Sequence, residues 1–307
     1  MNVLDRRLVE RVAGDLLTSP GLVEKDWHVT RAIGVLATLD HGGARPAFGG
    51  GTSLSKAWGL IKRFSEDIDF KVAMPSTSSR SQAKKARSAY RERVLAALTS
   101  AGFTLAGEPM RRDESRFFSA DLAYPSLFES GPGLRAHIRV EMQLEDPALP
   151  SIERPIGSLI SFVNRQAPEV AAFPCVDPVE TAADKLSALA WRVHARNRSS
   201  EGDDPTIIRH LHDLAALESH VAAAPDFVRL ARRAATDDAG RGGGTAPAVV
   251  GDRFAMMLDR LQRESFWAAE YDQFVRDVSF APPGETISFA EALAAGRRLV
   301  ASVQMGE

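Results

Sequence analysis

The chain has 307 residues, of which 44% are hydrophobic and 25% are charged, so we expect a folded soluble protein of one large or two modest domains. The formal net charge of −2 gives no overall attraction for nucleic acid, and any such binding must come from a local patch. The single cysteine, Cys175, excludes an intramolecular disulfide and a multi-cysteine zinc site. No run approaches 18 apolar residues and the first residues lack the apolar core of a signal peptide, so we expect a cytoplasmic protein with no membrane partner.

Two helices are expected at the start of the chain. Apolar residues recur at helical spacing over residues 4–17, and Pro20-Gly21 interrupts the pattern. A second helix is expected over residues 23–39, and its first turns carry the charged run Glu24-Lys25-Asp26. A short strand at residues 47–48 then leads into a run of glycines.

The run Gly49–Gly51 lets the backbone approach a ligand closely, because glycine has no Cβ. Thr52 or Ser53 is expected to N-cap a helix that continues to about Ile61. Free N–H groups and the helix dipole at such a start favour an anion. The run is neither a Walker A loop nor a G-x-G-x-x-G fingerprint, because the required Lys and Gly positions are missing. Taken alone, such a turn is also typical of a tight loop.

An acidic strand follows this helix. Apolar residues alternate with Asp67, Asp69 and Lys71, so both carboxylates lie on one strand face, roughly 6–7 Å apart. Two carboxylates placed in this way can bind divalent metals such as Mg²⁺ or Mn²⁺. An isolated Asp-x-Asp can also be a solvated strand edge. The order strand, glycine turn, helix and acidic strand indicates a metal-dependent enzyme that acts on a nucleoside triphosphate.

The rest of the first half predicts a mixed sheet. A Ser/Thr-rich linker over residues 75–81 and a helix over residues 82–101 come first. In a later strand Glu141 falls on the polar face, where it is the expected third metal ligand, the alternative being a solvated strand face. The expected strands cover residues 103–105, 116–124, 136–144 and 156–160.

The helix over residues 82–101 and its approach carry a dense basic cluster. Arg80, Lys84, Arg87 and Arg91 follow helical spacing and would form one stripe that suits an RNA backbone, while Tyr90 could stack on a base. A solvated basic face is the alternative. A positive rim could be extended by Arg192, Arg196 and Arg198.

From residue 178 onward the pattern is helical, with loops expected over residues 197–204 and 236–246. We therefore predict an α/β domain with N-terminal helices over residues 1–175 and a helical domain over residues 176–307. The expected helices cover residues 178–196, 205–222, 224–235, 247–263, 265–277 and 288–303.

The motifs together resemble a known family. Gly50-Gly51-Thr52-Ser53-Leu54-x-Lys56 followed by Arg63-x-Ser65-x-Asp67-Ile68-Asp69-Phe70 is similar to the nucleotidyltransferase superfamily signature, and more narrowly to the AbiEii/AbiGii toxins of type IV toxin–antitoxin systems, which include the MenT toxins. The resemblance covers about residues 20–220, and the last third carries no matching motif. The other matches are Glu24-Lys25-Asp26, Asp184-Lys185-Leu186 and Arg209-His210-Leu211-His212-Asp213-Leu214.

The resemblance implies a polymerase-beta-like mixed α/β (α+β) fold whose helical C-terminal half completes the active-site cleft. It implies that Lys185 contacts nucleotide phosphates and that Asp213 orients Lys185 or helps to activate the acceptor. A kinase-like antitoxin phosphorylates the serine matching Ser65 in some members, and a plain strand-end hydroxyl is the alternative. The metal ligands would be Asp67, Asp69 and Glu141, and the nucleotide would be held at Gly50, Gly51, Thr52, Ser53, Lys56 and Ser65.

The expected reaction moves a nucleotide from an NTP to an RNA acceptor, the 3′ end of tRNA being the acceptor we expect, with release of pyrophosphate and a block of translation. An AbiEi-like or kinase-like antitoxin is the expected partner. An Asp-x-Asp glycosyltransferase is the first alternative, disfavoured because the glycine turn precedes the acidic strand by one helix. A non-catalytic nucleotide-binding regulator is the second, disfavoured because Asp67 and Asp69 are both present.

Overall fold

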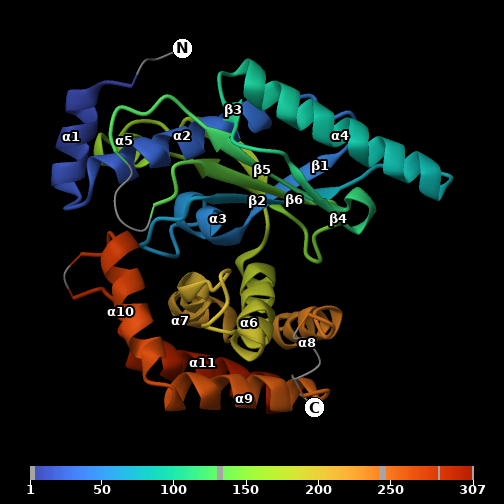
Figure 1. The fold of residues 1–307 in the computed structure, drawn as a ribbon, viewed down its shortest axis with the longest axis vertical. Coiled ribbons are helices and arrows are strands. Elements are labelled where there is room, and N and C mark those ends of the chain that lie inside the picture. Colours follow the sequence, from blue (N-terminus) through green and yellow to red (C-terminus); the bar gives the residue numbers. More distant parts are fainter. Residues whose placement is uncertain (1–3, 130–133, 242–246, 283, 306–307) are drawn as a thin grey trace. The chain divides into compact units, whose positions relative to one another are not determined.

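The computed structural model describes residues 4–129, 134–241, 247–282 and 284–305. The chain divides into two compact units, Met1–Asp177 and Pro178–Glu307. Figure 1 shows that the first unit contains the sheet and that the second is built from helices.

Within the described residues the first unit forms an eight-stranded mixed sheet in the order β3-β5-β6-β2-β1-β8-β7, with β4 paired to β5. β2 runs parallel to β6 and antiparallel to β1, and β1 runs parallel to β8. The mixed α/β architecture predicted from the sequence is confirmed. The strands are β1 Arg45–Gly49, β2 Asp67–Ala73, β3 Thr104–Leu105, β4 Met110–Arg112, β5 Phe117–Ala123, β6 Ile138–Gln143, β7 Ile152–Ile156 and β8 Val170–Cys175.

The helices of the first unit begin at side-chain caps that the sequence supplies. Asp5, Ser19 and Ser79 each accept a hydrogen bond from a backbone N–H in the first turn of the helix that follows. These caps set the starts of the three longest helices of the unit. The helices are α1 Arg6–Asp15, α2 Pro20–Ala37, α3 Gly50–Lys56, α4 Arg80–Ser100 and α5 Leu159–Val163, and a 3₁₀ turn, η1, spans Asp113–Ser115.

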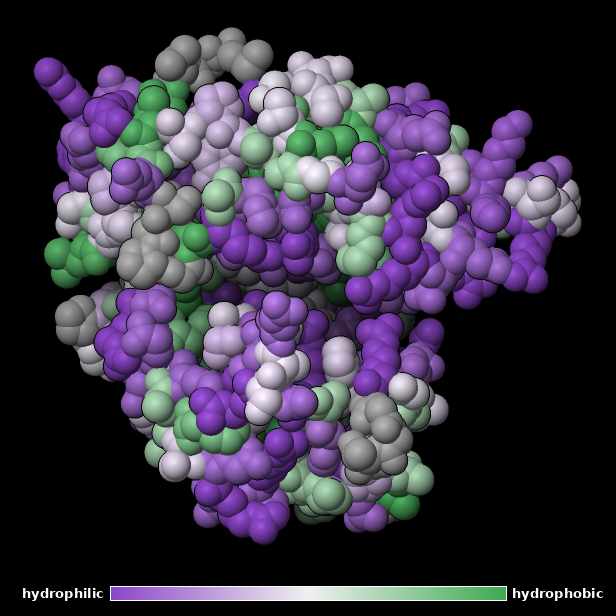
Figure 2. Space-filling model, viewed as in Figure 1, coloured by the Kyte–Doolittle hydropathy of each residue, from purple (hydrophilic) through white to green (hydrophobic). Residues whose placement is uncertain are grey.

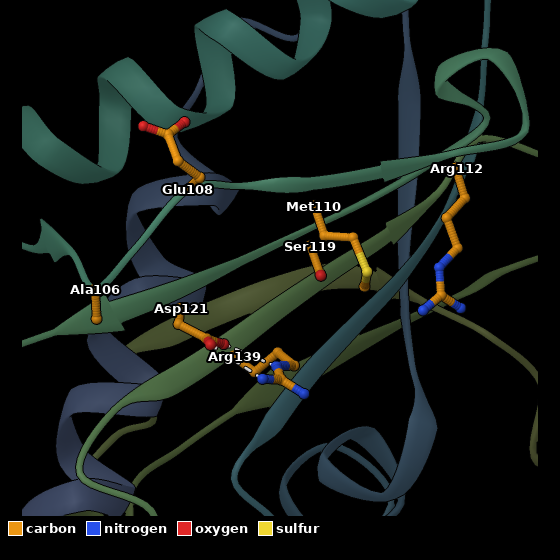
Figure 3. A pocket seen from close by; sticks show the side chains of 7 residues that line it. All are labelled: Ala106, Glu108, Met110, Arg112, Ser119, Asp121 and Arg139. Atoms are coloured by element: carbon orange, nitrogen blue, oxygen red, sulfur yellow. Dashed lines mark hydrogen bonds and ion pairs between the residues drawn. The ribbon is translucent and has the colours of Figure 1, made fainter. Parts of the chain in front are cut away.

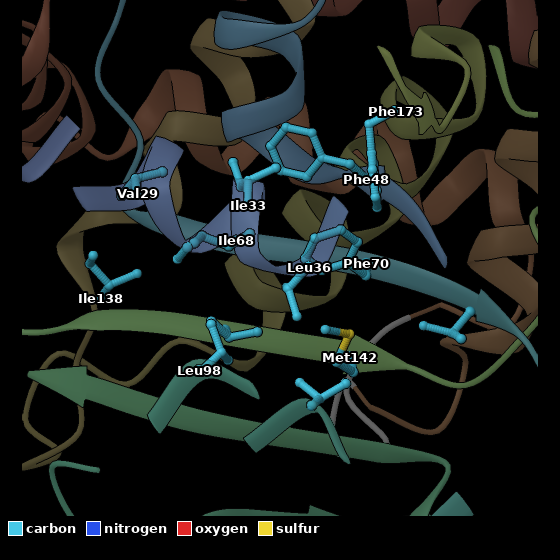
Figure 4. Packing of buried hydrophobic residues seen from close by; sticks show 14 of the residues in the cluster. Val29, Ile33, Leu36, Phe48, Ile68, Phe70, Leu98, Ile138, Met142 and Phe173 are labelled. Carbon is cyan, nitrogen blue, oxygen red and sulfur yellow. The ribbon is translucent and has the colours of Figure 1, made fainter. Parts of the chain in front are cut away.

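One face of the sheet forms the apolar core with α2 and α4. Figure 4 shows Ile33 and Leu36 of α2 and Leu98 of α4 packed with strand residues such as Phe70 and Met142. Strand side chains alternate between the two faces, so every second residue of β2 is buried here while its neighbours point to the opposite face. The opposite face therefore carries the polar side chains.

The second unit is helical throughout its described part. α6 packs against α7, α8 and α9, and α11 packs against α7 and α9. Trp267 and Tyr271 of α10 are among its largest buried side chains. No helix of the described residues has the length and apolar character needed to cross a membrane. The helices are α6 Pro178–Ala195, α7 Arg209–Val221, α8 Phe227–Asp237, α9 Val250–Arg263, α10 Phe266–Val278 and α11 Phe289–Met305, with a 3₁₀ turn, η2, at Pro205–Ile208.

Three local expectations were wrong. Gly49 is the N-cap of α3, so Thr52 and Ser53 lie inside the helix, which ends at Lys56 and not at Ile61. The strand expected over residues 156–160 ends at Ile156, because the Ser158 hydroxyl caps α5. The strands β4 and β8 were not predicted, and part of the expected loop, residues 242–246, lies outside the described residues.

Candidate functional site

β2 and β6 place three carboxylates on the polar face of the sheet. Asp67 and Asp69 are half-buried, while the intervening Ile68 is fully buried, as the strand alternation requires. In the parallel register of β2 and β6, Asp69 is opposite Glu141 and Asp67 is opposite Arg139. Residues opposite each other on paired strands point to the same face, and neighbouring strands are about 4.8 Å apart. The Glu141 carboxylate therefore lies on the same face as Asp69, one strand away.

The glycine turn is fitted against the acidic strand. Gly50 has φ +67°, and a Cβ built there would lie 1.8 Å from Oδ2 of Asp69. A Cβ at Gly51 would lie 2.8 Å from Arg63 Nη2 and 3.0 Å from Ser65 Oγ. Glycine is needed here so that the Asp69 carboxylate and the Ser65 hydroxyl can approach the turn. From the sequence alone, this freedom is expected to serve only the approach of a ligand.

The side chains that follow the glycines are buried beneath the turn. The Thr52 hydroxyl donates to the carbonyl oxygen of Asp67 and lies 3.3 Å from that of Ser65. The Ser53 hydroxyl is also buried and lies next to the Cys175 thiol. Both side chains thus face the interior, and Gly50 is the half-exposed residue of the turn. A nucleotide contact by Thr52 or Ser53 would have to use their backbone N–H groups.

The Glu24-Lys25-Asp26 run of α2 is buried, and Lys25 and Asp26 form ion pairs with residues next to the site. The Lys56 ammonium pairs with Asp26 at 2.5 Å, and these side chains are only 4% and 5% exposed. Burial raises the pKa of the Asp26 carboxyl, and the positive charge of Lys56 acts in the opposite direction and lowers it. Lys56 also donates to the Thr30 hydroxyl at 2.9 Å. Lys56, which the sequence predicts to contact the nucleotide, is therefore held inside the unit as the counter-ion of Asp26.

A second charged network includes Asp67, one of the expected metal ligands. Lys25 pairs with Glu66 and donates to the carbonyl oxygen of Arg135 at 2.5 Å. The Arg135 Nε donates to Glu66 at 2.5 Å, and its guanidinium also pairs with Asp67. Arg135 is not predicted from the sequence, because it belongs to no motif and reaches Asp67 only through the fold.

The polar face continues from β6 onto β5. Ser119 is opposite Glu141 and Asp121 is opposite Arg139. Arg139 donates two hydrogen bonds, of 2.7 and 3.0 Å, to the Asp121 carboxylate. These bonds hold the pKa of the Asp121 carboxyl below its ordinary value. A cavity of about 340 Å³ opens beside this pair (Figure 3). Its lining residues are Ala106, Glu108, Met110, Arg112, Ser119, Asp121 and Arg139.

In the helical unit the structure brings together the two residues singled out there. The Lys185 ammonium on α6 lies 2.8 Å from Oδ2 of Asp213 on α7, and these side chains are 9% and 0% exposed. His212 Nδ1 lies 3.5 Å from the other carboxylate oxygen. Burial lowers the pKa of His210 well below its ordinary value, so this imidazole is neutral at pH 7.

The carboxylates of the polar face fit a divalent cation by chemistry. Across the residues that the structure describes, no three or more histidine, cysteine, aspartate or glutamate side chains are arranged as a metal cluster. Mg²⁺ keeps several waters and needs only one or two protein carboxylates. Asp67 and Asp69 on one strand face supply these, and Glu141 lies one strand away.

The predicted basic stripe on α4 is wrong in part. Arg87 is only 9% exposed and Tyr90 only 3%, and the Tyr90 hydroxyl is 3.3 Å from His41 Nδ1, so Tyr90 cannot stack on a base. Both residues lie on the face of α4 that packs on the core. Lys84 and Lys85 are exposed, and Figure 2 shows a hydrophilic surface over α4.

The expected positive rim in the helical unit is also wrong at its centre. Arg196 is held between Asp203 and Glu270 by hydrogen bonds of 2.6 to 3.0 Å, and its side chain is only 4% exposed. Arg192 and Arg198 lie 3.7 and 3.6 Å from the carboxylates of Asp204 and Glu270. These arginines are largely occupied by acidic partners of their own unit.

Comparisons with known proteins identify a family and a related fold. The family model described as nucleotidyl transferase AbiEii toxin, type IV toxin–antitoxin system, matches residues 35–295. Among solved structures, the nucleotidyltransferase toxin MenT4 from Mycobacterium tuberculosis H37Rv is similar with a TM-score of 0.55 and 22% identity, over 98% of this chain and 99% of that one. At this identity the likeness shows a shared fold. No curated protein sequence matches the chain.

Proposed function

The chain belongs to the AbiEii nucleotidyltransferase toxin family of type IV toxin–antitoxin systems, and on this basis we propose that it transfers a nucleotide from an NTP to an RNA acceptor. The observation that carries the proposal is the close packing of Asp69 against Gly50, which unites the acidic strand with the glycine turn. The acceptor we propose is the 3′ end of tRNA. Its modification in the cytoplasm would block translation.

The proposed reaction is an in-line displacement at phosphorus. The acceptor hydroxyl loses its proton to solvent as its oxygen forms a bond to the α-phosphorus, the bond between the α-phosphorus and the bridging oxygen breaks, and pyrophosphate leaves. Asp67, Asp69 and Glu141 would hold Mg²⁺ or Mn²⁺, which neutralises charge on the phosphates when bound. The backbone N–H groups of Gly50 and Gly51 are proposed to bind the triphosphate, since Gly50 is the half-exposed residue of the turn.

Lys185 and Asp213 are proposed to take part in nucleotide binding, as their family motifs indicate. The 2.8 Å ion pair supports a division of roles in which Asp213 fixes the ammonium and Lys185 contacts phosphate. Lys56 is not included, because Asp26 already holds its ammonium inside the unit.

Ser65 is a proposed control point for an antitoxin. Its hydroxyl lies 3.0 Å from the position of a Cβ on Gly51 and two residues before Asp67. A phosphate on Ser65 would add about −1.5 to −2 charges beside the carboxylates and repel a triphosphate. A kinase-like antitoxin would act in this way. An AbiEi-like partner would instead act without modifying Ser65.

The test is to incubate the purified protein with each radiolabelled NTP, Mg²⁺ and total cellular RNA. We expect label in tRNA and one pyrophosphate per nucleotide added, and neither with Asp69→Asn. Release of a nucleoside diphosphate from a nucleotide sugar would support the glycosyltransferase instead. Nucleotide binding without any turnover would support the regulator.

A further inference from the structure

The cavity between β4, β5 and β6 lies on the same face of the sheet as the metal-binding carboxylates. Its floor contains Ser119, Asp121 and Arg139, and its wall is formed by Met110 and Arg112 of β4 (Figure 3). β4 is antiparallel to β5, with Met110 opposite Ser119, so the wall and the floor share one face. Ser119 is in turn opposite Glu141, which is opposite Asp69. A continuous polar surface therefore runs from the cavity to the acidic strand.

We propose that this cavity binds the terminal nucleotide of the RNA acceptor, an inference that rests on the proposed function. In an in-line displacement the attacking oxygen and the leaving group lie on opposite sides of the phosphorus. The glycine turn follows β1, which flanks β2 on one side, whereas β6 and β5 flank β2 on the other. If the pyrophosphate departs on the side of Gly50, the acceptor hydroxyl must therefore approach from the side of β6 and β5.

The chemistry of the lining suits a nucleotide. Arg112 is exposed, and its side chain forms no hydrogen bond or ion pair within the described part of the chain, so its guanidinium can bind a phosphodiester. The Arg139–Asp121 pair presents both donors and acceptors to a base or ribose edge. Met110 supplies an adaptable apolar contact for a base. A volume of about 340 Å³ is at the lower end for small-molecule sites, which fits a single nucleotide.

β4 also offers a matched control. Arg111 is exposed, adjacent to Arg112, and alternation places it on the opposite face of β4. Arg111→Gln and Arg112→Gln remove the same charge from neighbouring positions. A difference between the two variants would therefore depend on which face of β4 the arginine occupies and not on the loss of net charge.

The experiment compares the full-length wild type, Arg112→Gln and Arg111→Gln with unfractionated tRNA. Equilibrium binding is measured over a salt series, and KM is measured for tRNA and for the NTP. We expect Arg112→Gln to weaken tRNA binding and raise the KM for tRNA about tenfold, and to lower the salt slope by about one. The KM for the NTP should stay within about twofold, and Arg111→Gln should resemble the wild type.

The two hypotheses fail in different ways. Wild-type protein that transfers no label to any RNA would refute the proposed function. Equal tRNA affinity and equal salt slope for the two arginine variants would overturn the acceptor subsite, whether or not transfer occurs. A loss of NTP affinity in Arg112→Gln without a change in tRNA affinity would also overturn it, because the cavity would then serve the donor.

Discussion

Arg135 and Asp67 form an ion pair at the start of the acidic strand, and the Arg135 Nε also donates to Glu66 at 2.5 Å. A carboxylate proposed to bind a divalent cation thus already carries a protein cation. Binding of a metal must compete with this guanidinium for the oxygens of Asp67. Glu66 keeps a second partner, Lys25, so loss of Arg135 would not leave it without a counter-ion.

We therefore predict that Arg135→Gln raises the affinity for Mn²⁺ about threefold to tenfold, measured by calorimetry without nucleotide. A gain of this size corresponds to about 0.7 to 1.4 kcal/mol. Arg111→Gln, on β4, is the control for the lost charge and should bind Mn²⁺ as the wild type does. Unchanged or weaker binding by Arg135→Gln would mean that Arg135 supports the carboxylate geometry and does not compete.

Removal of either aspartate of β2 should abolish transfer and leave the fold intact. Asp67 and Asp69 are half-buried on the polar face and contribute nothing to the apolar core. Asp67→Ala and Asp69→Ala should therefore melt near the wild-type temperature while nucleotide transfer to RNA falls below detection. A folded Asp69→Ala protein with wild-type turnover would end the two-carboxylate mechanism.

Gly50→Ala should damage the site more than the same substitution at another glycine with positive φ. Gly50 has φ +67° and would place a Cβ 1.8 Å from the Asp69 carboxylate. Gly59 has a similar φ of +63°, but its Cβ would meet nothing within 4 Å. Gly59→Ala therefore measures the backbone strain alone, about 1 kcal/mol.

We expect Gly50→Ala to lower the free energy of unfolding further and to abolish transfer, because Asp69 must move. Thermal melting and the transfer assay, run on both variants, test this. Equal melting temperatures and equal activity for the two variants would show that Asp69 relaxes without consequence.

Some of these features follow from local sequence rules. The alternation around Asp67 and Asp69 predicted their shared strand face, and the serine and aspartate caps agree with the starts of the long helices. Mixed α/β architecture follows from the order of such elements, and the structure confirms it. Each of these depends on residues close together in the chain.

The missed features depend on contacts between distant residues. Lys56 and Asp26 are 30 positions apart, and nothing local shows that they pair in the interior. Arg87 is a basic residue on the buried face of α4, where a simple charge pattern assigns it to solvent. β4 has only three residues, too few for a periodic signal, and exists because β5 pairs with it.

The Lys185–Asp213 pair should be needed both for activity and for stability. We predict that Lys185→Ala and Asp213→Ala each lower kcat/KM at least tenfold, about 1.4 kcal/mol. Asp213 is fully buried, so Asp213→Ala removes the carboxylate that neutralises the buried Lys185 ammonium and should destabilise the protein by about 3 kcal/mol or more. The double variant should recover part of that stability.

Urea titration separates the two effects for this pair. Activity is compared where each variant is fully folded, and the free energy of unfolding is measured for all three variants. Full activity in both single variants, with unchanged NTP binding, would leave the helical unit a structural role only.

His28 should make the protein lose stability on mild acidification. Its imidazole is 4% exposed and stacks on Tyr124 with ring centroids 4.1 Å apart. Burial, aided by the charge of Arg31, lowers the pKa of His28 to about 4. The unfolded chain takes up a proton near pH 6.5 and the folded chain only near pH 4, so stability is complete above about pH 6.5 and falls as the pH drops toward 4. The full loss is about 3 kcal/mol.

His28→Phe keeps an aromatic ring in this position and removes the titrating group, so its unfolding free energy should vary less between pH 6.5 and 4 than that of the wild type. The exposed His220 on α7 supplies the control, and His220→Gln should follow the wild-type curve. Urea unfolding at half-unit pH steps gives the three curves. A wild-type curve parallel to that of His28→Phe would show that His28 accepts a proton inside the fold without cost, against the burial that the structure shows.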